Sequence, residues 1–298
     1  MPELKHRLAA IALKASAHLP LRWSRGLGYL LGSYLDRSNA EMAQVTRENL
    51  RLCYPTMHEA ALRQLARRSL IETARALFET GAVWLRDYAW LQTRIVGVEG
   101  IEQAQQALAD PRGLIILAPH MGNWEVLGLY LSTLGPVTSL YQPPDNPDLE
   151  QIVRSSREKV GATLVPTNRQ GVAALLKVLK NGGFTAILPD QVPDPSGGDF
   201  APFFGVPALT MTLVHNLVQR THSQVLMAYA RRVPEGFVIV FKSALEGIGD
   251  SDQVYSLSQM NRSIEACVAD IPDQYQWEYK RFRKQPPGLP KPYQKSKK

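Results

Sequence analysis

A histidine and a glutamate five residues apart form the pair in this chain best suited to proton transfer. They belong to the segment Pro119-His-Met-Gly-Asn-Trp-Glu125. A carboxylate that accepts a hydrogen bond from one imidazole nitrogen fixes the tautomer and leaves the other nitrogen free to take a proton. Residues five apart on a regular helix point about 140° apart, so His120 must lie in a turn before the helix. Pro119 and Gly122 favour such a turn; otherwise the pair is a helix-capping histidine and a surface glutamate.

Other catalytic motifs are missing from the sequence. The chain has no Gly-x-Ser-x-Gly nucleophile motif, no His-Glu-x-x-His zinc motif and no glycine-rich phosphate or dinucleotide loop. Its two cysteines, Cys53 and Cys267, are too few for a disulfide framework and lack the spacing of a zinc site, which favours a cytosolic protein. We therefore expect no cofactor and no metal. The remaining chemistry is a base, His120, that activates an external nucleophile, most simply a substrate hydroxyl.

The elements that must position this pair follow from the hydrophobic pattern. Apolar runs predict strands at residues 113–118, 137–140, 163–165, 184–188, 224–229 and 237–241. Helix-like segments separate them at residues 122–134, 147–160, 170–181, 208–221 and 253–270, and residues 1–90 are helical throughout, with a long helix from about His58 to Trp84. This alternation predicts an α/β fold with a largely parallel central sheet. Sites in such sheets form at the carboxyl ends of strands, and His120 follows the first apolar run directly.

The N-terminal region contains amphipathic stretches. Apolar residues recur on one helical face at Trp23, Leu27, Leu30, Leu31 and Tyr34, with Arg22 and Arg25 on the other side, and an earlier stripe comprises Leu4, Leu8, Ile11, Ala15 and Leu19. We find neither a run of about 20 apolar residues nor a signal peptide. The stripes either pack on the protein's own core or lie in a membrane interface.

Positive charge gathers at the two ends of the chain. The net charge is +7, of which residues 1–40 carry +4 and residues 278–298 carry +7, so that the remainder carries −4. Basic ends suit a surface of phosphates, although the C-terminal tail is equally explained as a solvated charged end. No recognisable nucleic-acid-binding module is present. We expect contact with a membrane surface for at least one N-terminal stripe, and no nucleic acid as a partner.

Several blocks of the sequence together resemble one enzyme family. His120-x4-Glu125 resembles the first block of the lysophospholipid acyltransferase superfamily, and in detail that of its lipid A late-acyltransferase branch. Further blocks occur in the order of that branch: Asn49-Leu-Arg-Leu-Cys-Tyr-Pro55, Phe78-Glu-Thr-Gly81 with Trp84, Pro144-Asp-Asn-Pro147 with Arg157, Pro189-Asp-Gln191 with Phe200 and Phe203-Phe-Gly205, and Tyr275-Gln-Trp277 with Arg281-Phe-Arg283 and Pro286-Pro-Gly288. Together they extend over about residues 45–290.

The resemblance implies a fold and a reaction. The fold is an αβα sandwich of the glycerol-3-phosphate acyltransferase type with N-terminal membrane-docking helices: residues 1–90 form the docking layer, 91–290 the acyltransferase core and 291–298 a basic tail, in one structural domain. The reaction is acyl transfer from acyl carrier protein to a hydroxyl of a lipid A precursor. His120 would deprotonate that hydroxyl while Glu125 orients the imidazole. The residues implied to contact substrate are Asn123, Arg157, Asp190, Gln191, Phe203, Phe204 and Arg281.

Two alternatives remain open at this point. The segment His120-Met-Gly-Asn-Trp-Glu125 also resembles that of phosphatidylinositol mannoside acyltransferases, which use acyl-CoA, so the acceptor could be another glycolipid or a lysophospholipid. A non-catalytic membrane-surface binding protein on the same scaffold is the other alternative. Many lipid A acyltransferases begin with a spanning helix, whereas this chain has only basic amphipathic stretches. The implied location is the cytoplasmic face of a bacterial inner membrane, in a peripheral or monotopic position.

Overall fold

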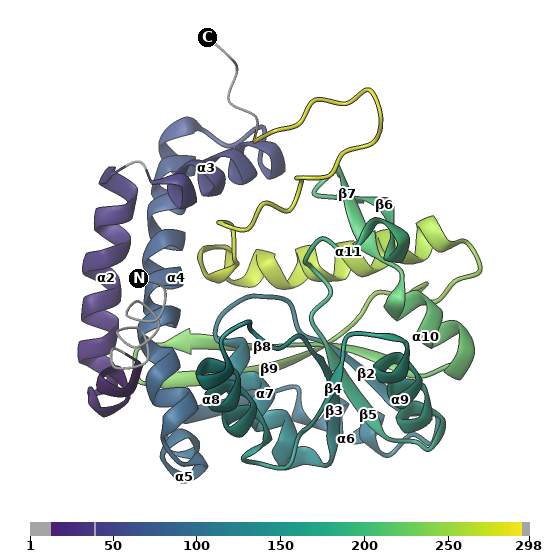
Figure 1. Cartoon of the computed structure of the whole chain (residues 1–298). Helices are drawn as coiled ribbons and strands as arrows, with labels where there is room; N and C mark the ends of the chain where they lie inside the picture. The colour runs from purple at the N-terminus through teal and green to yellow at the C-terminus, as the bar shows by residue number, and fades with distance from the viewer. Residues whose placement is uncertain (1–12, 39, 294–298) are drawn as a thin grey trace.

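A mixed β-sheet lies at the centre of the protein (Figure 1), and it has seven strands. The structure is a computed structural model that describes residues 13–38 and 40–293. The sheet order is β1-β9-β8-β2-β5-β3-β4. Its strands are β1 (Ile95–Glu99), β2 (Leu114–Leu117), β3 (Val137–Tyr141), β4 (Thr163–Pro166), β5 (Phe184–Ile187), β8 (Gln224–Val233) and β9 (Gly236–Ser243). Neighbouring strands are parallel except for the antiparallel pair β8–β9. The prediction of an α/β fold with a largely parallel sheet is confirmed.

Helices cover both faces of this sheet. They are α2 (Leu21–Ser38), α3 (Glu41–Cys53), α4 (Glu59–Leu85), α5 (Tyr88–Gln92), α6 (Ile101–Leu108), α7 (Trp124–Leu134), α8 (Pro147–Glu158), α9 (Arg169–Lys180), α10 (Leu213–Thr221) and α11 (Gln253–Asp270). Leu114 and Ile116 of β2 pack in a core with residues of α6 and α7. Ile115 and Leu117 pack in a second core with residues of α9, α10 and α11. Because side chains of a strand alternate between faces, the uninterrupted apolar run of β2 is buried on both sides.

The six predicted strands all occur, and β1 forms although it was not predicted. Two other strands form where a loop and the start of a helix were expected. These are β6 (Gly198–Phe203) and β7 (Val206–Met211), which pair as a separate antiparallel hairpin. The predicted helix at 208–221 therefore begins later, at Leu213. The hairpin turn is Phe204-Gly205, and both residues adopt left-handed backbone conformations with φ of 50° and 76°. A phenylalanine at positive φ is uncommon, so little in the local residue pattern indicates this turn.

Helix α2 packs against the long helix α4 through small residues. A Cβ atom on Gly28 would lie 2.6 Å from the Cα of Arg75, and one on Gly32 would lie 2.4 Å from the Cα of Ile71. The two backbones therefore approach closely, as they do where small residues repeat every four positions. Since this small face is turned inward, the larger apolar residues of α2 face outward.

The exposed face of α2 is the stripe that the sequence pattern identified. Trp23, Leu30 and Tyr34 are 62%, 64% and 65% exposed, and Leu27 is 40% exposed, whereas Leu31 is partly buried. No helix within residues 13–38 and 40–293 is long and apolar enough to cross a bilayer. Most of the earlier stripe, Leu4 to Ile11, and most of the basic tail, residues 294–298, lie outside the described residues.

Candidate active site

The central sheet brings His120 and Asp190 to the same edge. Strands β2 and β5 are parallel neighbours with Leu117 opposite Ile187 in register. His120 lies three residues beyond the end of β2, and Asp190 lies three residues beyond the end of β5. Parallel strands end at the same side of a sheet, where the sites of open α/β folds form. Two residues 70 positions apart in sequence thereby become neighbours.

Asp190 holds His120 through two hydrogen bonds, one with the imidazole and one with the backbone N–H. Its Oδ1 lies 2.7 Å from Nδ1, and its Oδ2 accepts from the backbone N–H of His120 at 2.9 Å. Burial alone would raise the pKa of Asp190, but His120 and these hydrogen bonds hold that pKa below its usual value. An ionised carboxylate only accepts hydrogen bonds, so Nδ1 carries the proton. The other ring nitrogen, Nε2, is then the atom that can accept a proton from a substrate.

Gln191 and Trp124 complete the surroundings of the imidazole. The Nε2 atom of Gln191 lies 3.2 Å from Nε2 of His120, which is within reach for an amide N–H to donate to the ring nitrogen. The ring of Trp124 meets the imidazole edge-on, with 5.3 Å between the ring centroids. The tilt of the imidazole is thus limited by the indole, while Asp190 fixes its tautomer.

Glu125 is bound by Arg157 instead of by His120. The Nε and Nη2 atoms of Arg157 donate to the two carboxylate oxygens at 3.1 and 2.5 Å. Burial would lower the pKa of Arg157, but pairing with Glu125 raises it above its usual value. The predicted turn is present, since α7 begins at Trp124 and places His120 before it and Glu125 in its first turn. Glu125 was expected to orient the imidazole, and this expectation is corrected. The acid that contacts the imidazole is Asp190, at the end of the neighbouring strand β5, whereas Glu125 faces α8.

A cavity of about 510 Å³ opens beside His120. This volume falls within the usual range for small-molecule sites. Glu125, Arg157 and Gln191 border it together with His120, and most of its wall is apolar. Prominent apolar residues of the wall come from α7 and from the ends of β3, β4 and β5: Leu127, Leu131, Leu140, Leu164, Ile187 and Leu188. The arrangement can therefore hold a substrate with a long apolar part while a basic nitrogen faces its reactive end.

Arg281 and the two predicted phenylalanines lie elsewhere, away from this cavity. Arg281 is buried and donates to the backbone oxygen of Leu209 at 2.6 Å and to Oγ1 of Thr210 at 3.0 Å, so it supports the β6–β7 hairpin. Burial lowers its pKa. Phe203 is part of the core beneath the hairpin, and Phe204 forms the hairpin turn. The aromatic character of this block serves packing within the protein.

Asn123 is also turned away from the main cavity. Its side-chain oxygen accepts from the backbone N–H of Val126 at 3.2 Å, which caps α7. Its amide donates to Glu79 at 3.0 Å, inside the protein. Asn123 borders a second, smaller cavity of about 190 Å³, which shares Trp124 and Glu125 with the first.

Two aromatic rings at the cavity were not predicted from the sequence, the indole of Trp124 and the ring of Tyr141. Tyr141, the last residue of β3, borders the cavity, and the guanidinium of Arg157 lies 5.5 Å from its ring centroid. Trp124 lies within the histidine–glutamate segment, and its large aromatic ring could have indicated a place at the site. Within residues 13–38 and 40–293 there is no group of three or more His, Cys, Asp or Glu side chains that could hold a metal.

The site is thus a histidine fixed by a buried carboxylate beside an apolar cavity. Residues 4–284 match the family described as bacterial lipid A biosynthesis acyltransferase. The lipid A biosynthesis lauroyltransferase of Escherichia coli strain K12 is 26% identical over 276 residues, which are 90% of this chain and 87% of the relative. The palmitoleoyltransferase of the same pathway and strain is 24% identical over 268 residues, 88% and 85% of the two chains. The myristoyltransferase is 21% identical over 293 residues, 97% and 90% of the two chains.

The family match extends over nearly the whole chain. The protein therefore belongs to the bacterial lipid A biosynthesis acyltransferases, and it is an acyltransferase enzyme. The family resemblance drawn from the ordered sequence blocks is confirmed.

Proposed function

We propose that this enzyme transfers a fatty acyl chain from acyl carrier protein to a hydroxyl of a lipid A precursor. The observation that carries the proposal is His120, held by Asp190 at 2.7 Å and facing an apolar cavity of about 510 Å³. An acyl chain supplies the apolar part that such a cavity accommodates. The acceptor is proposed from the relatives, which are named for lauroyl, palmitoleoyl and myristoyl transfer in lipid A biosynthesis.

In the proposed mechanism His120 is the general base. Its Nε2 takes the proton of the acceptor hydroxyl as the oxygen attacks the thioester carbonyl. The tetrahedral intermediate then releases the thiolate of the donor, which takes the proton back from the imidazolium. Asp190 stabilises the imidazolium between these two steps. The products are the new ester and the free thiol, and the histidine returns to its starting state.

Two residues that border the cavity, Gln191 and Arg157, have proposed roles in substrate binding. The amide of Gln191, 3.2 Å from Nε2, lies where it can donate to the reacting oxygen. Arg157 keeps about a third of its side chain exposed while paired with Glu125. A guanidinium can serve a carboxylate and a phosphate oxygen at once because it has five donors. We therefore assign Arg157 the phosphate or thioester region of a substrate, with Glu125 setting its position.

Mass spectrometry of lipids from cells with and without the enzyme tests the acceptor. We expect lipid A from cells lacking it to be lighter by one acyl group, and the purified enzyme to use acyl carrier protein thioester in preference to acyl-CoA. An unchanged lipid A pattern with a change in another glycolipid or a lysophospholipid would reject the lipid A acceptor while retaining acyl transfer. Preference for acyl-CoA would reject only the donor.

We also propose that α2 docks on an anionic lipid surface. Its outward face carries Trp23, Leu27, Leu30 and Tyr34, all of them exposed. Arg22 and Arg37 on the same helix are exposed as well. Aromatic and leucine side chains flanked by arginines are the composition of helices that lie in a membrane interface. The acceptor of the proposed reaction is itself a membrane lipid, so docking would bring the site to its substrate.

Replacing Trp23 and Leu30 together by serine is expected to weaken binding to anionic phospholipid vesicles by at least roughly 10-fold, since burying each side chain contributes about 1.5–3 kcal/mol. The melting temperature should change little, because both side chains are exposed at 62% and 64%. Vesicle sedimentation measures the binding. Val254→Ser on α11, which also removes an exposed apolar side chain, is the control and should bind as the wild type does. Undiminished binding of the double variant would reject docking through α2.

A further inference from the structure

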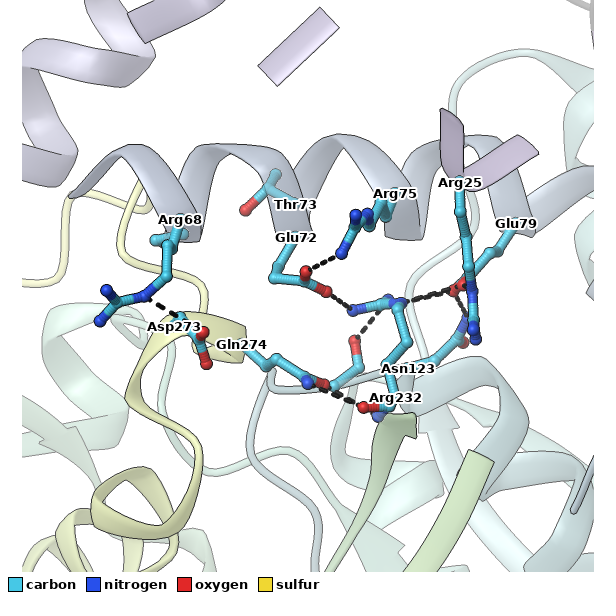
Figure 2. Close-up of polar contacts among 12 residues, drawn as sticks. Arg25, Arg68, Glu72, Thr73, Arg75, Glu79, Asn123, Arg232, Asp273 and Gln274 are labelled. Carbon is cyan, nitrogen blue, oxygen red and sulfur yellow. Dashed lines mark hydrogen bonds and ion pairs between the residues drawn. The ribbon is translucent and has the colours of Figure 1, made fainter. Parts of the chain in front are cut away.

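A buried ionic network joins α2, α4 and the end of β8 (Figure 2). At its centre is Glu79, whose side chain is completely buried. Three side chains donate to its carboxylate: Arg25 at 2.7 Å, Arg232 at 2.9 and 3.0 Å, and Asn123 at 3.0 Å. Burial would raise the pKa of Glu79, but Arg232 and Arg25 hold it below its usual value. Glu79 is therefore an ionised carboxylate inside the protein.

Arg25 and Arg232 are themselves held by other hydrogen bonds, so they fix the position of the Glu79 carboxylate. Arg232 donates from Nη1 to Glu72 at 2.8 Å. Arg25 donates to the backbone oxygens of Val233, Pro234 and Gly236 at 2.5, 2.9 and 2.9 Å, which anchors α2 to the β8–β9 turn. A carboxylate with this many fixed donors has a single position. Asn123 is the member of the network that leads to the site.

The segment between His120 and Glu125 is held by this network and by the sheet. The amide of Asn123 contacts Glu79 and its carbonyl oxygen caps α7, while its backbone N–H donates to Ala230 at 2.9 Å. Gly122 adopts a left-handed conformation with φ of 58°, and a Cβ atom there would lie 1.9 Å from the oxygen of Ala230. Only glycine fits this close approach. Glu125 lies two residues after the N-cap Asn123, in the first turn of α7, so the place of Asn123 determines the direction of that turn.

Stability alone does not account for such a network. Burying several charges costs desolvation free energy, and apolar side chains of similar volume often stabilise a protein equally well or better. What an ionic network supplies is direction, because each hydrogen bond fixes an angle as well as a distance. Here the network fixes the orientation of Asn123, the residue that caps α7, the helix that carries Glu125.

We propose that Glu79 is a positioning residue for acyl transfer, which acts through Asn123 on the turn between His120 and Glu125. The proposal rests on the proposed catalytic function of that segment. Glu79 contacts Asn123 and the two arginines, and it does not border the main cavity. Loss of the Glu79–Asn123 contact should therefore lower kcat, and it should raise the KM only slightly, through the effect of Glu125 on Arg157.

Asn123→Ser separates the two roles of this side chain. Serine is a good helix N-cap, so α7 keeps its cap, but the hydroxyl lacks the amide donor that reaches Glu79. We expect kcat to fall by between about 10- and 100-fold, as misplacement of a reacting group by about 1 Å does. Asn261→Ser is the matched control, because Asn261 is also buried on a helix and donates to Pro202 and Thr210 at 2.9 and 3.0 Å, away from the site. It should lower the melting temperature without lowering kcat.

Exchanging the amide and the carboxylate between positions 123 and 79 tests whether their contact itself is needed for activity. Asn123→Asp alone places two carboxylates in contact and should lower kcat more than Asn123→Ser does. Combining it with Glu79→Gln restores an amide and a carboxylate with their positions exchanged, and aspartate still caps the helix. We expect the double variant to recover kcat to a value above that of Asn123→Asp alone, and not to the wild-type value, because the glutamine at position 79 no longer supplies a carboxylate to Arg25 and Arg232.

Hydrogen exchange of the backbone amides of residues 121–126 gives a reading that does not depend on activity. Faster exchange in Asn123→Ser, with lower kcat and recovery in the double variant, supports the proposal. It is overturned if Asn123→Ser lowers kcat no more than Asn261→Ser does, or if the folded double variant does not recover. If the wild type transfers no acyl group from either donor, the proposed function fails. The exchange measurement then still decides whether Glu79 positions the turn.

Discussion

Replacing His120 by asparagine is expected to lower kcat by roughly 10²–10⁴-fold, the usual contribution of a positioned general base. Asparagine can still accept a hydrogen bond, but it cannot take the proton of the acceptor hydroxyl. The KM values should change little, because the apolar wall of the cavity that would hold the acyl chain is left intact. Initial rates with acyl carrier protein thioester and a lipid A precursor, each varied in turn, measure both quantities.

His222→Asn is the matched control for this experiment. His222 is exposed at the end of α10, and its φ of 54° is a left-handed conformation that asparagine adopts readily. It should retain wild-type rates. If His120→Asn retained full transfer activity while the protein stayed folded, His120 would not be the base and the mechanism proposed above would be wrong.

The sheet was predictable because its strands are buried on both faces. Runs such as Leu114-Ile-Ile-Leu117 between polar turns are typical of a central parallel strand, and all six predicted strands formed. The β6–β7 hairpin was not predicted, because its turn depends on Phe204 adopting a left-handed conformation. That conformation is stabilised by tertiary contacts of the ring with Tyr54 and Trp277, at 5.2 and 5.8 Å between centroids. No local pattern reveals such contacts.

The position of His120 could be predicted, but the identity of its partner could not. A histidine directly after an apolar run lies at a strand end, and that much is local. Which acid meets it depends on strand order, and β5 rather than β3 is the neighbour of β2. Glu125 was expected as the partner because it is close in sequence. Asp190 was expected at the site from the family resemblance, and the sheet gives it the contact with the imidazole.

Which face of α2 packs inward could not be predicted from the spacing of its apolar residues. A stripe of Trp23, Leu27, Leu30 and Tyr34 predicts an apolar face equally well whether that face is buried or exposed. The deciding residues are Gly28 and Gly32, which allow α4 to approach the opposite face closely. Arg25 lies on that inner side and is buried against Glu79. A pattern of small residues on one face and large apolar residues on the other therefore indicates which face packs inward, whereas the spacing of the apolar residues alone does not.

Asp190→Asn is expected to lower kcat by roughly 10²–10⁴-fold, because the asparagine can no longer stabilise the imidazolium that forms during transfer. An amide can also donate to Nδ1, which favours the tautomer whose proton is on Nε2 and which cannot act as the base at that atom. Initial rates with acyl carrier protein thioester and a lipid A precursor, measured as for His120→Asn, test this expected loss of kcat. Asp252→Asn is the control, since Asp252 caps α11 from an exposed position and asparagine caps equally well.

Asp190→Asn should also change how the free energy of unfolding depends on pH. The pKa of Asp190 is below its usual value in the folded protein, so the unfolded chain binds this proton first as the pH falls. The contribution of the carboxylate is therefore fully present above about pH 4 and is lost as the pH falls through the folded pKa. Below about pH 4 the free energy of unfolding of the wild type should fall more steeply with pH than that of Asp190→Asn. Equal slopes in urea unfolding series across this range would show that the imidazole does not hold the carboxylate in its ionised form.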